Sequence, residues 1–151
     1  MREHMGLYRG KRIDNGEWVE GYLTQHTFVG CEETQLGYVI EPAPKKLWAV
    51  ESFKVDPNTI GECTSLKDKN GKLIFEGDVV REYYNGKCVV EYGRHKIGCC
   101  GCCYDYHESV GFYLKDKWDS PHSDDEAWHG LEIIGNVHDN PELLKGGEGN
   151  G

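Results

Sequence analysis

The residues with the most distinctive chemistry are four cysteines in the second half of the chain. Cys99, Cys100, Cys102 and Cys103 surround Gly101 and form two overlapping C-x-x-C spacings. Zinc is held in proteins by four thiolate or imidazole ligands in a tetrahedron, and a C-x-x-C turn brings two sulfurs onto one ion. We therefore predict that these four cysteines are the site of any bound metal, which would be a structural zinc.

Two interpretations of this cysteine cluster stay open. A zinc ion could take two of the cysteines and complete its coordination with Cys63, Cys88 or a histidine, because His95 and His107 flank the cluster. However, a zinc ribbon carries a second C-x-x-C roughly 15–20 residues away, and the sequence has none. The alternative is a hairpin loop with reduced thiols. A redox role is disfavoured because no helix begins at the cluster to lower a thiol pKa.

A second candidate site lies near the amino terminus. Arg9, Lys11 and Arg12 form a basic segment, and Trp18 follows a few residues later. Guanidinium and ammonium groups bind phosphate oxygens, and aromatic rings stack on bases or hold cations. These four residues therefore predict a ligand-binding site suited to a small phosphorylated ligand. The simpler alternative is that they form the solvated end of a strand.

Recognisable catalytic motifs are absent from the sequence. It contains no G-x-S-x-G elbow, no Walker A loop and no H-E-x-x-H. His122, Asp124, Asp125 and His129 are possible ligands for a divalent cation, but their Ser- and Pro-containing surroundings are typical of a solvated loop. We therefore expect no enzymatic activity.

Composition and charge limit the partners of this 151-residue chain. A net charge of −9 repels phosphate backbones, so nucleic-acid binding is disfavoured. Four Trp and nine Tyr exceed the needs of a small core, and both residue types are enriched in protein interfaces. No apolar run reaches the roughly 18 residues that span a bilayer, and the first residues lack the apolar segment of a signal peptide. We expect a cytoplasmic protein that does not bind membranes.

Turn signals at short intervals predict strands rather than helices. Asn-Gly, the strongest short hairpin signal, occurs at residues 15–16, 70–71 and 85–86. The turn Lys69–Gly71 is predicted to be of type I′, with Leu66 and Phe75 on its flanking strands reaching the core. Only Pro141–Leu144, preceded by Asn140 as a cap, predicts a helical turn.

The fold class expected from these signals is mostly β, either all-β or α+β with minimal helix. Residues 1–62 are predicted to form a β-rich N-terminal segment. Residues 63–145 hold five strand-like runs with hairpin spacing, which is typical of a small SH3-like β-barrel. Residues 146–151 are a Gly-rich polar tail, which is expected to be disordered.

Three stretches of sequence stand out together. They are Leu7–Val19, Val55–Gly61 continuing into Ser65–Val80, and Ile133–Leu144. In this order they resemble the YopX family of phage and prophage proteins, from about residue 6 to residue 145. The resemblance implies phage origin, action inside an infected or lysogenic bacterium, and homo-oligomers. It implies no reaction and no catalytic residues.

The function expected from the residues and the resemblance is that of a non-enzymatic phage accessory protein. It would bind a host or phage protein, as a homo-oligomer, in the cytoplasm of the bacterial host. One alternative is an oligomeric sponge that sequesters a nucleotide signal of host immunity in pockets of Arg and aromatic residues. Another is a zinc-stabilised nucleic-acid-binding module, which would need a continuous basic face. Apart from the zinc, no cofactor is expected.

Overall fold

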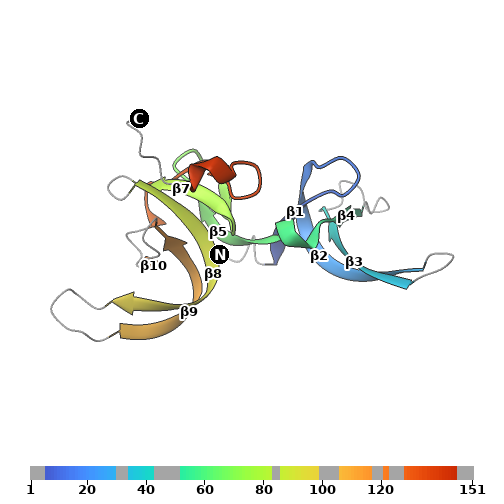
Figure 1. Cartoon of the computed structure of the whole chain (residues 1–151), viewed down its shortest axis with the longest axis horizontal. Helices are drawn as coiled ribbons and strands as arrows, with labels where there is room; N and C mark the ends of the chain where they lie inside the picture. Colours follow the sequence, from blue (N-terminus) through green and yellow to red (C-terminus); the bar gives the residue numbers. More distant parts are fainter. Residues whose placement is uncertain are drawn as a thin grey trace. The chain divides into compact units, whose positions relative to one another are not determined.

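A computed structural model describes residues 6–29, 34–42, 52–82, 86–98, 106–116, 121–122 and 128–145. These residues form mainly strands with short 3₁₀-helices, which confirms the mostly β prediction (Figure 1). The chain divides into two compact units, Met1–Ser65 and Leu66–Gly151, whereas the sequence suggested a division after residue 62. The predicted tail at residues 146–151 lies outside the described residues.

The strands pair into two antiparallel sheets. The first has the order β4-β3-β2-β1-β5-β6 and the second has the order β10-β9-β8-β7-β11. As paired among the described residues both sheets are open, and the predicted SH3-like barrel is not confirmed. Their bounds are β1 Leu7–Lys11, β2 Trp18–Val29, β3 Thr34–Glu41, β4 Phe53–Val55, β5 Gly61–Lys67, β6 Leu73–Phe75, β7 Asp78–Glu82, β8 Gly86–Gly98, β9 Tyr106–Lys115, β10 Pro121–His122 and β11 Glu132–Asn136.

The first unit depends on close approaches of backbone at two glycines. Gly10 on β1 faces the core, where Ile40 and Val55 are fully buried, and a Cβ on Gly10 would lie 3.1 Å from the Cβ of Val55. At Gly21 on β2, a Cβ would overlap the carbonyl oxygen of Glu41. Glycine at these positions lets β1 pack closely on Val55 and lets β2 approach the backbone at Glu41.

The second unit has its own hydrophobic core beneath β7, β8 and β9. The sheet's alternation sends one set of side chains inward, where they are removed from water. The buried members of this core are Ile74, Val80, Cys88, Val90, Leu114 and Leu131.

No helix among the described residues is long and apolar enough to cross a membrane.

The turn between β5 and β6 is a hairpin, as predicted, but its geometry differs from the predicted type. Gly71 has φ +80°, and its amide donates to the carbonyl of Asp68 at 3.0 Å. Asn70 does not have positive φ, so the type I′ prediction is wrong. The hydrogen bond from the amide of Asp68 to the carbonyl of Lys72 at 2.8 Å closes a longer loop, in which only Gly71 needs the left-handed region.

Asp68 links this turn to β11. Its buried carboxylate accepts hydrogen bonds from the amides of Asn70 and Lys72, each at 2.9 Å, and from the amide of Ile133 at 3.2 Å. Burial raises the pKa of Asp68, but the amide hydrogen bonds outweigh burial and hold this pKa below the ordinary value of 3.8. The ionised carboxylate is therefore part of the folded structure.

The strands flanking the turn confirm one half of the core prediction. Phe75 is buried at 2% exposure, as expected, whereas Leu66 is 42% exposed, so its predicted place in the core is wrong. The cause lies one residue earlier, because Ser65 has φ +66°, a left-handed conformation that interrupts the in–out alternation of β5.

Candidate ligand-binding surface

The β1–β2 hairpin places the predicted basic and aromatic residues on one face of the first sheet. Arg9 and Lys11 are two residues apart on β1 and therefore point the same way. Across the ladder Trp18 lies directly opposite Lys11, and Glu20 lies opposite Arg9. Side chains opposite each other across a ladder share a face, so Trp18 joins the two cations.

The two cations lie over the indole ring. The guanidinium carbon of Arg9 is 4.8 Å from the centroid of the Trp18 ring, and the ammonium nitrogen of Lys11 is 5.5 Å from it. Both distances fall within the roughly 6 Å over which the ring quadrupole attracts a cation. All three side chains are half-buried. Three of the four residues predicted for this site are thus brought together.

A short 3₁₀-helix, η1 (Pro57–Thr59), holds the backbone of β1 at Lys11. The hydroxyl of buried Thr59 accepts from the amide of Lys11 at 2.8 Å and donates to the carbonyl of Asp56 at 2.7 Å. The amide of Asp56 donates to the carbonyl of Lys11 at 2.9 Å. Both backbone polar groups of Lys11 are therefore tied to η1, which fixes the strand beneath the two cations.

Arg12 is the predicted site residue that the structure does not bring to Trp18. Strand alternation turns it to the opposite face, where its guanidinium carbon lies 4.2 Å from the ring centroid of Phe53. Its Nε and Nη2 donate to the two carboxylate oxygens of Asp14 at 2.9 and 2.5 Å. The hydrogen bond from Arg12 holds the pKa of Asp14 below its usual value. Asp14 thus balances the charge of Arg12 within the hairpin.

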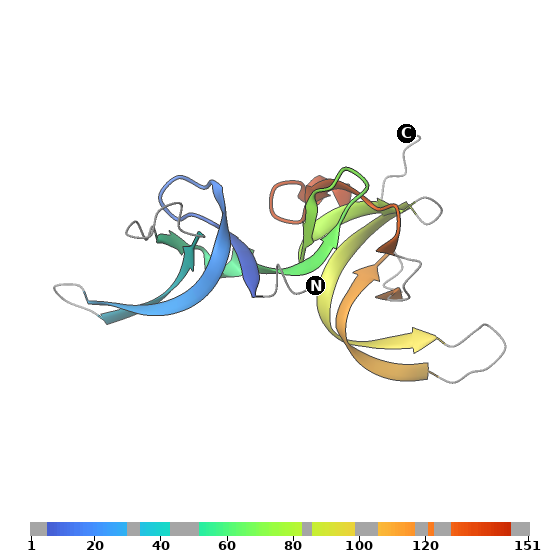
Figure 2. The same cartoon turned by 180° about the vertical axis from the view of Figure 1, so that it is seen from behind.

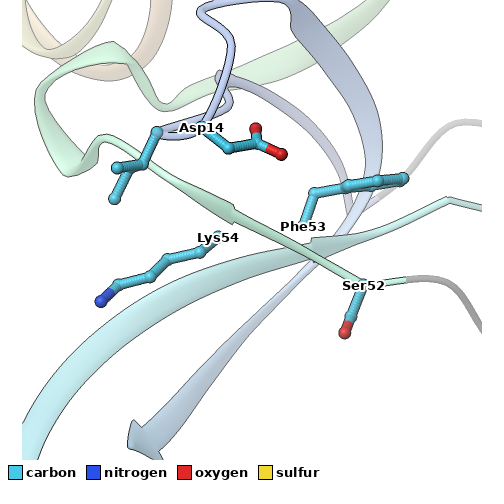
Figure 3. A pocket seen from close by; sticks show the side chains of 5 residues that line it. Asp14, Ser52, Phe53 and Lys54 are labelled. Atoms are coloured by element: carbon cyan, nitrogen blue, oxygen red, sulfur yellow. The ribbon is translucent and has the colours of Figure 1, made fainter.

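An open pocket of about 250 Å³ lies next to Arg12 (Figure 3). Ile13 and the Phe53 ring supply its apolar lining, and Asp14, Ser52 and Lys54 supply its polar groups. Figure 3 shows the Asp14 carboxylate directed toward Phe53, while Lys54 extends away in the other direction. The sequence did not reveal this pocket, because the segment that carries Phe53 follows Arg12 by about 40 residues and only the register of β4 brings it there.

One further aromatic residue belongs with the predicted site. Tyr22 is 53% exposed and lies on the same face as Trp18 by the alternation of β2. We call Arg9, Lys11, Trp18 and Tyr22 the Trp18 face. The acidic side chain of Glu20 also lies on this face, opposite Arg9. The face therefore combines basic, aromatic and acidic groups, and it is not the continuous basic patch that nucleic-acid binding would need.

The predicted metal ligands Cys99, Cys100, Cys102 and Cys103 lie outside the described residues, so zinc binding there stays a prediction. Elsewhere in the described parts of the chain, no group of three or more His, Cys, Asp or Glu is arranged to hold a metal ion.

The two cysteines suggested as additional zinc ligands, Cys63 and Cys88, are both buried, and neither forms a disulfide in the described part of the chain. The pKa of Cys88 is raised to about 12, mainly by burial and to a smaller extent by the nearby carboxylates of Glu82 and Asp116. Zinc binds the thiolate, so a thiol whose proton is harder to remove than that of an ordinary cysteine is a poorer ligand. Cys88 is better explained as part of the core.

The carboxyl-terminal stretch of the family resemblance forms a turn between β11 and the 3₁₀-helix η3 (Pro141–Leu143). The side-chain oxygen of Asn136 accepts from the amides of His138 and Asp139 at 3.0 and 2.9 Å. A Cβ on Gly135 would lie 2.6 Å from the side-chain oxygen of Asn140, so a larger residue would displace the Asn140 side chain, which accepts a hydrogen bond from the amide of Asn136 at 3.4 Å. These motif residues shape the turn. The predicted one-turn helix is confirmed, although Asn140 makes no side-chain cap.

The family model described as YopX protein matches residues 7–145, a span that contains all three stretches named above and confirms the resemblance. No curated protein matches the chain.

Proposed function

Because this chain belongs to the YopX family, we propose that it is a non-enzymatic phage accessory protein that binds a host or phage protein as a homo-oligomer in the bacterial cytoplasm. The observation that carries the proposal is the Trp18 face, where Arg9 and Lys11 lie over the indole and Tyr22 is exposed. Trp, Tyr and Arg are the residue types that contribute most binding energy at protein interfaces.

The geometry of the Trp18 face favours binding because Arg9 and Lys11 already contact the Trp18 ring. A long side chain immobilised on association costs about 0.5–1.5 kcal/mol. Contact with the indole restrains both Arg9 and Lys11 before any partner arrives, and η1 holds the backbone beneath Lys11. A protein surface that offers acidic groups to Arg9 and Lys11, apolar groups to the rings and a basic group to Glu20 fits this arrangement.

Affinity capture with a paired control tests the proposal. The tagged wild-type protein, the double variant Arg9→Ala/Lys11→Ala and the control Lys72→Ala/Lys87→Ala are each purified from phage-infected cells. The control removes two positive charges at exposed lysines of the second unit. We expect the wild type and the control to retain the same amount of the same partner. The double variant should retain at least about tenfold less of that partner. Equal recovery by all three proteins would contradict a role for the Trp18 face.

A small nucleotide is the second candidate ligand, and the two cations over one indole favour it. Calorimetric titration of a nucleotide panel separates the candidates, because nucleotide binding that is lost in Arg9→Ala/Lys11→Ala would replace the protein partner as the main ligand. Glu20, which lies opposite Arg9, opposes a phosphate at this position, so we favour the protein partner.

Native mass spectrometry of the full chain tests self-association and metal binding in one measurement. We expect an oligomeric mass. If zinc is bound, its mass should be lost when all four cysteines of the cluster are replaced by serine. An exclusively monomeric mass at tens of micromolar, with no oligomer beside it, would contradict the homo-oligomer. Zinc that persists in the four-serine variant would move the metal site elsewhere.

A further inference from the structure

Most of the β8–β9 hairpin extends beyond the rest of its sheet. Of the ten paired positions between β8 and β9, those from Glu91–Tyr113 to Gly98–Tyr106 lie past the last pairing of β8 with β7 and of β9 with β10. Among the described residues these eight pairs form a two-stranded ribbon, and Figures 1 and 2 show its strands running together in yellow and orange.

One face of this ribbon continues the hydrophobic core into solvent. The pair Val90–Leu114 is fully buried, and the next pairs on the same face are Tyr92–Phe112, Arg94–Val110 and Lys96–Glu108. Tyr92 is 50% exposed and Val110 is 64% exposed. Tyr92 and Phe112 are in edge-to-face contact, with ring centroids 5.0 Å apart. We call Tyr92, Arg94, Lys96, Glu108, Val110 and Phe112 the ribbon face.

A two-stranded ribbon of this length gains little stability by itself. Isolated hairpins are marginal in water, and strands become stable when a hydrophobic face is covered. Tyr92 and Val110 stay exposed in the single chain, whereas Phe112 is partly buried against the core. A second surface that covers Tyr92, Val110 and Phe112 would both stabilise the ribbon and bury this apolar area.

We propose that the ribbon face binds the ribbon face of a second copy of this chain, with a two-fold axis running along the ribbon. The inference deepens the proposed function, because it rests on the homo-oligomer and names the surface that forms it. Under this symmetry each residue of β8 meets the β9 residue of the same pair in the other copy.

Pairwise complementarity is the reason for choosing a second copy as the occupant. The two-fold axis brings Tyr92 onto the partner's Phe112 and places Lys96 against the partner's Glu108. Arg94 meets the partner's Val110, over which its aliphatic stem can lie. No like charges meet across this axis, because the two cross-strand pairs that carry charge are Lys96–Glu108 and Arg94–Val110. A two-fold axis across the ribbon would instead bring Arg94 against the partner's Arg94.

The size of the ribbon face sets the expected strength of this contact. Three pairs per copy bury less than the roughly 1,200 Å² of a standard interface, so the dimer should be weak. We expect a Kd on the order of tens of micromolar, and a dimer that is populated at high protein concentration. Face-to-face sheets align within about 30°, which keeps all three pairs in contact.

Sedimentation equilibrium of the full chain from about 5 to about 500 μM tests this inference, because that range brackets the expected Kd. We expect the wild type to dimerise and Val110→Asp to weaken dimerisation at least about tenfold. The control Leu144→Asp also replaces an exposed apolar residue by Asp, but it lies outside the ribbon and should dimerise like the wild type.

Charge reversal tests the symmetry itself. Lys96→Glu and Glu108→Lys should each dimerise at least about tenfold more weakly, because each places like charges together twice across the axis. An equimolar mixture of these two variants should recover wild-type dimerisation, because both charge contacts become favourable between unlike copies. Neither folding nor pairing within one chain changes on mixing, so recovery reports the contact between copies.

The failures of the inference and of the proposed function can be distinguished. A wild-type oligomer that Val110→Asp leaves intact would overturn the ribbon face and keep the homo-oligomer. A mixture that stays monomeric, while the wild type dimerises, would overturn the proposed axis. A wild type that is monomeric throughout would overturn both the ribbon contact and the homo-oligomer, whereas partner capture by the Trp18 face is measured separately.

Discussion

Asp68 provides the sharpest test of how the second unit is held together. Its carboxylate accepts three amide hydrogen bonds, two within its own turn and one from Ile133 on β11. A hydrogen bond to a charged group contributes about 1.5–3 kcal/mol, and removing the acceptor leaves partly buried amides without it. Since such contributions are not additive, we expect Asp68→Ala to lower the free energy of unfolding by about 3–5 kcal/mol.

This loss should be large in a thermal experiment. In a domain of about 60–100 residues, 1 kcal/mol corresponds to about 4–8 °C in Tm, so Asp68→Ala should lower the midpoint by more than about 10 °C. Circular dichroism during heating measures the midpoint. Asp14→Asn is a suitable control because Asp14 also has a lowered pKa but is exposed, and its midpoint should change much less.

The pH dependence of Asp68→Asn tests the charge separately from the side-chain shape. The pKa of Asp68 is lower in the folded state than the roughly 3.9 of an unfolded chain. Its contribution is therefore fully present above about pH 4 and is lost as pH falls through the folded-state pKa. The stability gap between the wild type and Asp68→Asn, measured by urea unfolding, should narrow below pH 4. A gap that is equal at pH 7 and pH 3, or an Asp68→Ala midpoint near that of the wild type, would refute this account.

Four further outcomes follow from the backbone and the core. Gly71→Val should lower stability by about 1–2 kcal/mol in thermal unfolding, because a β-branched residue must then adopt φ +80°; an unchanged midpoint would mean that the turn relaxes freely. Gly21→Ala should destabilise strongly because its Cβ overlaps the carbonyl oxygen of Glu41, whereas Gly111→Ala, which meets open space, should cost little; equal effects in urea unfolding would contradict the close approach. Cys88, with its pKa raised to about 12, should resist maleimide at pH 8 in the folded protein and react on unfolding, as peptide mass spectrometry can follow; labelling of Cys88 under native conditions would show that the core opens. The raised pKa of Cys88 also makes stability depend on pH. Above about pH 8.5, the pKa of a cysteine in an unfolded chain, only the unfolded state loses the proton, so the free energy of unfolding should decrease as pH rises.

Local signals in the sequence predicted local structure well. Asn70-Gly71 identified a hairpin, and Gly71 has the positive φ that the prediction needed. The turn type was wrong because Asp68 closes a longer loop through its backbone and side chain, and that closure includes Ile133 from a distant strand. Leu66 was misplaced because nothing in the residue type of Ser65 indicates a left-handed conformation.

The candidate site shows the same limit. Arg9 and Lys11 could be paired with Trp18 from the sequence, because alternation and a short hairpin are enough to bring them together. The same alternation also separates Arg12 from them, a step that the prediction left out. The contributions of Phe53 and Thr59 could not be predicted, since each comes from a segment more than 40 residues away whose register depends on the folded core.

The attachment of η1 to Lys11 has a kinetic consequence. The Lys11 amide donates to a buried hydroxyl, and its carbonyl accepts the amide of Asp56, so β1 cannot move away unless both bonds break. Hydrogen exchange at the Lys11 amide should therefore be slow and should report the opening of η1. A surface that is preformed in this way needs no ordering step after encounter. Association at the Trp18 face should then proceed at about 10⁵–10⁷ M⁻¹s⁻¹, the rate typical of rigid docking, with partner lifetime setting the affinity.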